Sequence, residues 1–249
     1  MEHRSNAIIL KVTDYGEADR LVTFFTDSHG KLKGVAKNAK RSVKRFGGGL
    51  EIGTIGRVRF AEKAHVELVR LEDIAVETPA WKVASSLEKI IHLHAALELA
   101  DRMLPSSHPA ASRFALLSKW IGFLAASEPL ASHWHAFVYK WLLLSGVEPV
   151  FDRCVVCGRD GEEDYAGGWS FEERHGGLVC PRCHKGGGLN ITVAPVLMKY
   201  LEGLRGNRIL GGPGVQDGAD TVFECLVIHA IGRPLRSLGV ADKIWSSTL

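Results

Sequence analysis

The chain has 249 residues, of which 46% are apolar and 24% are charged, so it is long enough to bury more than one core. No apolar run reaches the roughly 20 residues that a membrane-spanning helix needs. The polar residues 1–5 lack the apolar core of a signal peptide. We therefore expect a cytoplasmic protein, and the ordinary aromatic and charged fractions argue against extensive disorder.

The net charge of +3 hides an uneven distribution. Between Asp27 and Glu51 the chain has seven basic residues and no acidic one, whereas the remaining sequence carries 24 basic and 28 acidic residues. The seven basic residues are Lys31, Lys33, Lys37, Lys40, Arg41, Lys44 and Arg45. The chain is thus mildly acidic apart from one basic segment.

The first third of the chain has the pattern of β-strands. Its stretches are rich in β-branched and aromatic residues, Gly30 ends a hairpin-type turn, and glycines at 47–49 separate the third stretch from the fourth. The expected strands are residues 7–12, 21–26, 31–37, 52–60 and 66–75. Five short strands predict a small closed barrel of the oligonucleotide-binding (OB) type, with a small sandwich as the alternative.

Pro79 marks a change from a period of two to a helical period of 3.6. A long helix is expected from near Trp81 until Pro105, with one apolar face made of Val83, Leu87, Ile90, Ile91, His94 and Leu97. Further helices are expected at residues 110–126, 131–145, 194–204 and 219–231, with a loop at 206–218 between the last two. The fold class is therefore a multidomain α+β protein: a barrel, then an all-α domain with a cysteine segment inserted.

Four of the five cysteines form two Cys-x-x-Cys pairs separated by 22 residues. Each pair can direct two sulfurs to one point, so Cys154, Cys157, Cys180 and Cys183 predict a closed Cys₄ site for one structural zinc ion. A redox-active pair or incidental thiols are the alternatives. His175 and His184 lie nearby, but four thiolates already fill the shell. Cys225 lies on an apolar helix and is expected in the core.

No catalytic constellation is recognisable. The phosphate-binding Gly-x-x-x-x-Gly-Lys-Ser/Thr element and the Gly-x-Ser-x-Gly element are absent. The histidine pairs 92/94 and 133/135 are spaced so that their members face different sides of a helix, which makes poor metal sites. We therefore do not expect an enzyme.

The basic segment is a candidate nucleic-acid interface. Loops and one sheet face of OB barrels bind nucleic-acid backbones, and the basic segment connects two strands of the expected barrel. Arg57, Arg59 and Arg70 on later strands extend the candidate interface, and Lys63 extends it further. Phe46 and Phe60 could stack on bases or could belong to the core. A merely solvated basic loop is the alternative to the whole assignment.

The chain resembles the bacterial recombination mediator RecO family across nearly its whole length. The resemblance rests on residues 7–10, 17–22 and 25–31, on the basic loop, and on the segments 143–149, 154–158 and 176–180. Where the family's loop commonly has a glycine, this chain has Asn38, a residue that tolerates the left-handed backbone.

The resemblance implies a non-enzymatic role in DNA repair. It implies binding to single- and double-stranded DNA, annealing of complementary strands, and loading of the RecA recombinase with RecR onto DNA coated by single-stranded DNA-binding protein (SSB). RecF is a further partner, and the location would be cytoplasmic, with the nucleoid. An RNA-binding OB protein and a zinc-dependent enzyme are the rival interpretations.

The expected domain organisation has four segments. Residues 1–78 are the DNA-binding barrel, residues 79–150 the first helical part, residues 151–188 the zinc module and residues 189–249 the second helical part.

Overall fold

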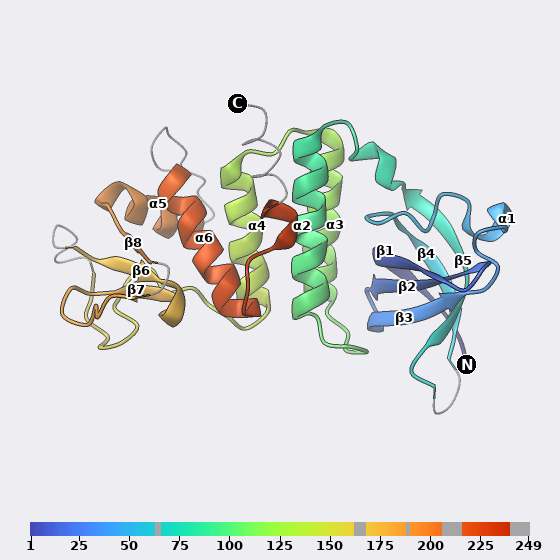
Figure 1. The fold of residues 1–249 in the computed structure, drawn as a ribbon, viewed down its shortest axis with the longest axis horizontal. Helices are drawn as coiled ribbons and strands as arrows, with labels where there is room; N and C mark the ends of the chain where they lie inside the picture. Colours follow the sequence, from blue (N-terminus) through green and yellow to red (C-terminus); the bar gives the residue numbers. More distant parts are fainter. Residues whose placement is uncertain (63–65, 162–167, 188–189, 206–215, 240–249) are drawn as a thin grey trace. The chain divides into compact units, whose positions relative to one another are not determined.

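The structure, a computed structural model, describes residues 1–62, 66–161, 168–187, 190–205 and 216–239 (Figure 1). The chain forms two compact units, Met1–Glu128 and Pro129–Leu249, and each is described by itself. No helix of the described residues is long and apolar enough to span a membrane. Lys63 and most of the loop expected at residues 206–218 lie outside the described residues.

The first unit begins with a closed five-stranded barrel, which confirms the OB-type prediction and not the alternative of a small sandwich (Figure 1). Around the barrel the strand order is β1-β2-β3-β5-β4, with β1 paired to β4 and only β3 and β5 parallel. The strands are β1 (Glu2–Tyr15), β2 (Asp19–Thr26), β3 (Gly30–Ala36), β4 (Ile55–Ala61) and β5 (Val69–Thr78).

β1 is longer than its apolar stretch predicts. Its polar ends are held by pairing, because Glu2 lies opposite Ala61 of β4 and Tyr15 lies opposite Asp19 of β2. Backbone hydrogen bonding to two neighbours therefore extends the strand beyond the residues that β-propensity selects. A register shift between Ile9 and Lys11 bends β1 so that it can close the barrel.

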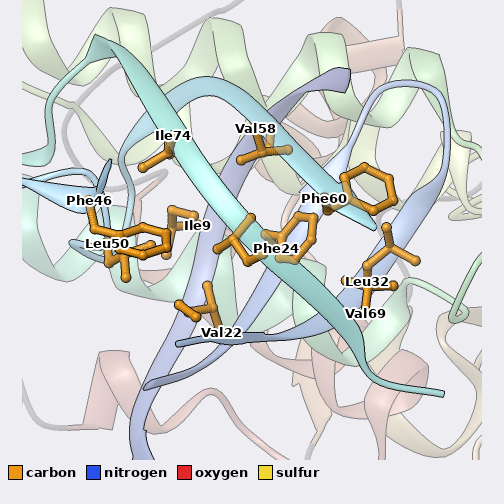
Figure 2. Close-up of a cluster of buried hydrophobic side chains, with 13 residues drawn as sticks. Ile9, Val22, Phe24, Leu32, Phe46, Leu50, Val58, Phe60, Val69 and Ile74 are labelled. Carbon is orange, nitrogen blue, oxygen red and sulfur yellow. The ribbon is translucent and has the colours of Figure 1, made fainter. Parts of the chain in front are cut away.

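The barrel interior is a continuous apolar core (Figure 2). Alternate residues of each strand point inward, as Leu32, Gly34 and Ala36 do on β3, while Lys31 and Lys33 point outward. The labelled members of this core are Ile9, Val22, Phe24, Leu32, Phe46, Leu50, Val58, Phe60, Val69 and Ile74. Phe46 enters from the short helix α1 (Val43–Phe46), so the loop that carries the basic segment is anchored to the barrel.

The same unit continues with a 3₁₀ turn, η1 (Ala80–Lys82), and two helices, α2 (Leu87–Met103) and α3 (Ala111–Ala126). The N-terminus of α2 is capped by Ser86, whose Oγ accepts a hydrogen bond from the Lys89 N–H. Phe25, on the outer face of β2, contacts the ring of Phe114 on α3 with centroids 5.5 Å apart. This contact packs the helical pair against the barrel.

The apolar face predicted for the first long helix is wrong in part. The helix begins at Leu87, after Val83, and both Leu87 and His94 are exposed. Ile91 and Leu97 are buried as predicted, and Leu93, Ala96 and Ala100, which the predicted face omits, are buried as well. Because α2 is enclosed on several sides, a single 3.6-residue stripe does not describe its burial.

The second unit contains α4 (Ala131–Leu144), α5 (Pro195–Arg205), α6 (Gln216–Ile231) and a three-stranded sheet of order β7-β6-β8. The strands are β6 (Ser170–Glu172), β7 (Gly177–Val179) and β8 (Asn190–Thr192), with the 3₁₀ turn η2 (Glu173–His175) between β6 and β7. The sequence did not predict these strands, since each has only three residues and no alternating pattern.

His135 connects α4, α5 and α6. Its ring is 1% exposed and is hydrogen-bonded to the Tyr200 hydroxyl at 2.8 Å and the Asp220 carboxylate at 2.7 Å. The ring also stacks on Phe223 with centroids 4.6 Å apart. His135 is therefore a packing residue.

Candidate nucleic-acid interface and metal centre

The basic segment extends from the outward face of β3 through the following loop into α1. Arg45 is fixed there by three contacts: it donates to the Lys37 carbonyl at 2.7 Å and to Ser42 Oγ at 3.0 Å, and its guanidinium lies 5.0 Å from the centre of the Phe46 ring. Since Phe46 is itself part of the barrel core, the loop presents its cations from a fixed backbone.

Two aspartates at the β1–β2 hairpin hold two lysines of this loop. Lys37 Nζ lies 3.2 Å from the Asp19 carboxylate, and Lys40 Nζ lies 3.0 Å from the Asp14 carboxylate. A backbone hydrogen bond from Asn38 lowers the pKa of Asp19, an effect that Lys37 reinforces and partial burial opposes. Asn38 has a φ of 57°, so the asparagine adopts the left-handed conformation that its place in the loop predicts.

Other candidate cations are also paired with carboxylates. Arg59 contacts Asp73 at 2.5 Å and Glu2 at 3.0 Å, and these hydrogen bonds raise its pKa. Arg70 lies 3.0 Å from Glu72.

Lys31 is similarly held. Its Nζ lies 3.4 Å from the Asp101 carboxylate of α2, and its side chain is only 13% exposed. Within the described residues, four of the ten candidate cations have exposed side chains and no ion pair. These four are Lys33, Arg41, Lys44 and Arg57.

The outer face of the barrel adds a cation that the sequence analysis missed. Lys11 of β1 lies opposite Thr23 of β2, which lies opposite Lys33 of β3, so the three side chains form one row across the sheet. Together with Lys31 and Ser106 they line a polar hollow of about 290 Å³. Only the strand register could have revealed Lys11, because it lies outside the basic segment in sequence.

The two phenylalanines considered for base stacking are core residues. Phe46 is 4% exposed and Phe60 is fully buried. Phe60 packs against Phe24 with centroids 5.9 Å apart and stacks on His3 at 5.2 Å. No nucleobase can reach either ring in this arrangement, so their stacking role is discarded.

The two Cys-x-x-Cys turns bring four sulfurs together in the second unit. The Sγ atoms of Cys154, Cys157, Cys180 and Cys183 all lie within 4.8 Å of one another, and none of the chain's cysteines forms a disulfide. β7 leads directly into the second pair. The first pair is held against the end of β7, because the Val155 N–H donates to the Leu178 carbonyl at 2.8 Å.

Backbone hydrogen bonds shape each turn toward the shared centre. The Gly158 N–H donates to the Cys154 carbonyl at 2.8 Å, and Gly158 has a φ of 73°, which a residue with a side chain rarely adopts. In the second turn the Cys183 N–H donates to the Cys180 carbonyl at 2.9 Å. The Cys180 N–H also donates to the Cys154 sulfur at 3.4 Å, which joins the two turns.

These distances fit a tetrahedral metal ion. Zinc–sulfur bonds of about 2.3 Å in a tetrahedron place neighbouring sulfurs about 3.8 Å apart, and the Cys157 and Cys180 sulfurs are 3.8 Å apart.

Although burial raises the pKa of Cys154, N–H groups of Cys180, Cys157 and Val156 lower it to about 6. The neighbouring sulfurs, Cys157 first, raise the pKa of Cys183 to about 12. Repulsion among the sulfurs thus opposes deprotonation of the fourth thiol unless a cation lies between them. The four cysteines can hold a structural metal ion, which would supply that charge.

The two nearby histidines contact a buried carboxylate beside the cysteine cluster. Glu172 of β6 is 6% exposed and lies 2.6 Å from His184 Nδ1 and 3.6 Å from His175 Nε2. Because His184 follows Cys183, the Glu172 contact fixes the second turn to the small sheet. Neither histidine belongs to the group of four cysteines that could hold a metal ion.

Two family models cover most of the chain. The model "Recombination protein O N terminal" matches residues 1–79, and "Recombination protein O C terminal" matches residues 84–239. The chain belongs to the RecO family. The resemblance inferred from the sequence motifs is thereby confirmed.

Relatives match along nearly their whole length. The DNA repair protein RecO of Myxococcus xanthus is 32% identical over 241 residues, covering 96% of each chain. The DNA repair protein RecO of Geobacter metallireducens is 32% identical over 246 residues, covering 97% of each chain. The RecO protein of Anaeromyxobacter sp. (strain Fw109-5) is 30% identical, covering 95% of this chain and 94% of its own. The chain is thus a member of a DNA repair protein family.

Proposed function

We propose that this protein is a DNA-binding recombination mediator without enzymatic activity. It binds single- and double-stranded DNA, anneals complementary strands and, with RecR, loads RecA onto single strands coated by SSB. RecF is a further candidate partner, and the protein works in the cytoplasm at the nucleoid. The observation that carries this proposal is the basic segment on the barrel: seven basic residues and no acidic one between Asp27 and Glu51.

The physical basis of annealing is charge neutralisation. Two complementary strands repel each other through their phosphates, and cations on a fixed loop lower that repulsion. Each phosphate contact also releases condensed counterions, which favours binding at low salt. Such contacts carry no base information, so the protein would anneal strands of any sequence. All ten cations remain candidates: Lys31, Lys33, Lys37, Lys40, Arg41, Lys44, Arg45, Arg57, Arg59 and Arg70.

We further propose that the metal ion is zinc and that its role is structural. Four thiolate ligands leave no open position for water or substrate, whereas a catalytic zinc keeps one position open. The module would stabilise residues 151–188 between the two helical parts, 79–150 and 189–249, and leave residues 1–78 as the DNA-binding barrel.

Annealing of complementary oligonucleotides coated with SSB tests the function directly. The variant with Lys37, Lys40, Arg41, Lys44 and Arg45 changed to Ala should lose annealing and DNA binding together. A matched control removes five exposed cations elsewhere, namely Lys119, Lys140, Lys199, Arg233 and Arg236. The control should anneal normally. Wild-type annealing by the first variant would show that the basic loop is a solvated surface, and DNA would then have to bind at Arg57, Arg59 and Arg70 or on the helical domain. Displacement of DNA by equimolar RNA would favour an RNA-binding function.

A further inference from the structure

Trp81 is an exposed tryptophan held on a fixed turn. Its side chain is 66% exposed, whereas the other four tryptophans of the described residues are at most 6% exposed. The backbone around it is hydrogen-bonded, since the Lys82 N–H donates to the Pro79 carbonyl at 3.2 Å and the Ala84 N–H to the Trp81 carbonyl at 3.1 Å. A large apolar ring is thus presented to solvent from a defined position, which is unusual for tryptophan.

The ring lies at the edge of a groove within the first unit, between the barrel and the start of the helical pair. The groove has a volume of about 580 Å³, within the range of small-molecule sites. Its walls are mainly apolar and come from β1, the loop before β4, and α2. The principal apolar wall residues are Val12, Leu50, Ile52, Ile90 and Leu93.

Three polar side chains indicate what the groove can hold. Arg20 supplies a cation to the lining of the groove, and its buried Nε has no hydrogen-bond partner among the described residues. Asp14 and Glu51 also line the groove. These two carboxylates can accept hydrogen bonds from the amino and imino groups of a nucleobase, but they repel phosphates, so the backbone of a bound strand has to lie outside the groove.

The groove adjoins the basic loop. Asp14, which lines the groove, also contacts Nζ of Lys40 at 3.0 Å. A strand whose phosphates follow the loop would therefore pass the mouth of the groove. Basic tracks combined with aromatic rings on which bases stack are the usual means by which proteins bind single strands.

We propose that this groove binds an unpaired nucleobase stacked on Trp81, which makes the protein select single-stranded over double-stranded DNA. The inference rests on the proposed function, because the phosphates are held by the basic loop. In a duplex each base is stacked and paired and cannot enter the groove without being flipped out. Trp81 therefore contributes to single-strand binding, whereas the loop contributes to both.

Binding of a labelled 20-nucleotide single strand and a 20-base-pair duplex, measured by fluorescence anisotropy, tests the inference. Trp81→Ala should weaken single-strand binding about tenfold, within the 5- to 150-fold range expected for one stacked base. Duplex binding should change less than twofold. Trp81→Phe keeps an aromatic ring and should retain most of the affinity. Leu144→Ala, which truncates an exposed side chain of the other unit, is the control.

The tryptophan also provides a spectroscopic signal. The difference between the fluorescence of the wild type and Trp81→Phe isolates Trp81, and an added single strand should protect this signal from iodide quenching. Unchanged quenching at a saturating concentration of single strand would mean that the bound DNA does not cover Trp81, and would overturn the inference.

The binding results separate the two proposals. Equal weakening of single-strand and duplex binding by Trp81→Ala, or no weakening of either, would overturn the inference while the function stands. A wild-type protein that binds neither DNA would overturn both.

Discussion

The carboxylate of Asp19 lies 3.2 Å from Nζ of Lys37 and also accepts a hydrogen bond from the Asn38 N–H at 2.8 Å. An acidic residue of the β1–β2 hairpin therefore both shapes the basic loop and neutralises part of it. Asp14 neutralises Lys40 in the same way. Bound phosphates would have to compete with these two carboxylates for the lysines.

Replacing both carboxylates should strengthen binding of duplex DNA, whose bases do not enter the groove that Asp14 lines. In Asp14→Asn/Asp19→Asn the two lysines are freed, and we expect affinity to rise about two- to fivefold per pair at low salt, the range for exposed ion pairs. The amide oxygen of Asn at position 19 can still accept from Asn38, which preserves the loop. Anisotropy at low and high salt measures the effect, and the gain should shrink as salt rises. An equal gain per removed charge in Glu148→Gln, an exposed site in the other unit, would show that only net charge matters.

Removal of one cysteine ligand should release the metal. Purified protein should contain about one equivalent of zinc, and Cys180→Ser should lose it and destabilise the second unit, because the site joins two turns of the chain. Cys225→Ala is the matched control, since Cys225 is buried in α6 and lies outside the sulfur cluster. Elemental analysis and thermal unfolding measure both effects. Full zinc content after replacement of two of the four cysteines would refute the ligand assignment.

The barrel and the cysteine cluster were predictable because local sequence determines them. Strand-forming stretches separated by Gly30 and residues 47–49 specify five strands, and two Cys-x-x-Cys turns specify one metal site. By contrast, the sequence could not predict that Lys11 lies in one row with Lys33, because that placement depends on the pairing of three strands.

The sequence could not distinguish free cations from paired ones. Lys31 and Arg59 look equivalent to Lys33 and Arg57 in a one-dimensional charge pattern. In the structure the first two contact carboxylates far away in the chain, Asp101 and Asp73 respectively. Long-range ion pairing is a tertiary property, so only the fold reveals which charges remain available.

Acid should remove the contribution of Asp27 to stability. Burial raises the pKa of Asp27, but hydrogen bonds from Ser5, Asn6 and Ser28 together lower it by more than burial raises it. The folded pKa is therefore below the ordinary value. Ser5 Oγ lies 2.5 Å and Asn6 Nδ2 2.8 Å from its carboxylate, which ties β1 to the turn after β2.

Because the folded pKa is the lower one, this stabilisation is complete above the unfolded value near 4 and is lost as pH falls through the folded pKa. Asp27→Asn should therefore lower the free energy of unfolding by about 1–3 kcal/mol at pH 7. The difference from wild type, measured by urea unfolding, should shrink below about pH 4. A difference independent of pH would show that the charge of Asp27 is unimportant.

Gly30 should tolerate substitution much less well than Gly16. Gly30 and Gly16 have positive φ values of 72° and 69°. Alanine at either position therefore lowers the stability of the fold by about 1–2 kcal/mol through backbone strain. A Cβ at Gly30 would also collide with the backbone of His108 between α2 and α3, whereas a Cβ at Gly16 would meet no atom within 4 Å. Gly30→Ala should therefore destabilise the first unit by clearly more than Gly16→Ala, because the β2–β3 turn would have to move away from the helices. Urea unfolding of the two variants measures this difference, and equal destabilisation would mean that the turn does not pack against His108 in solution.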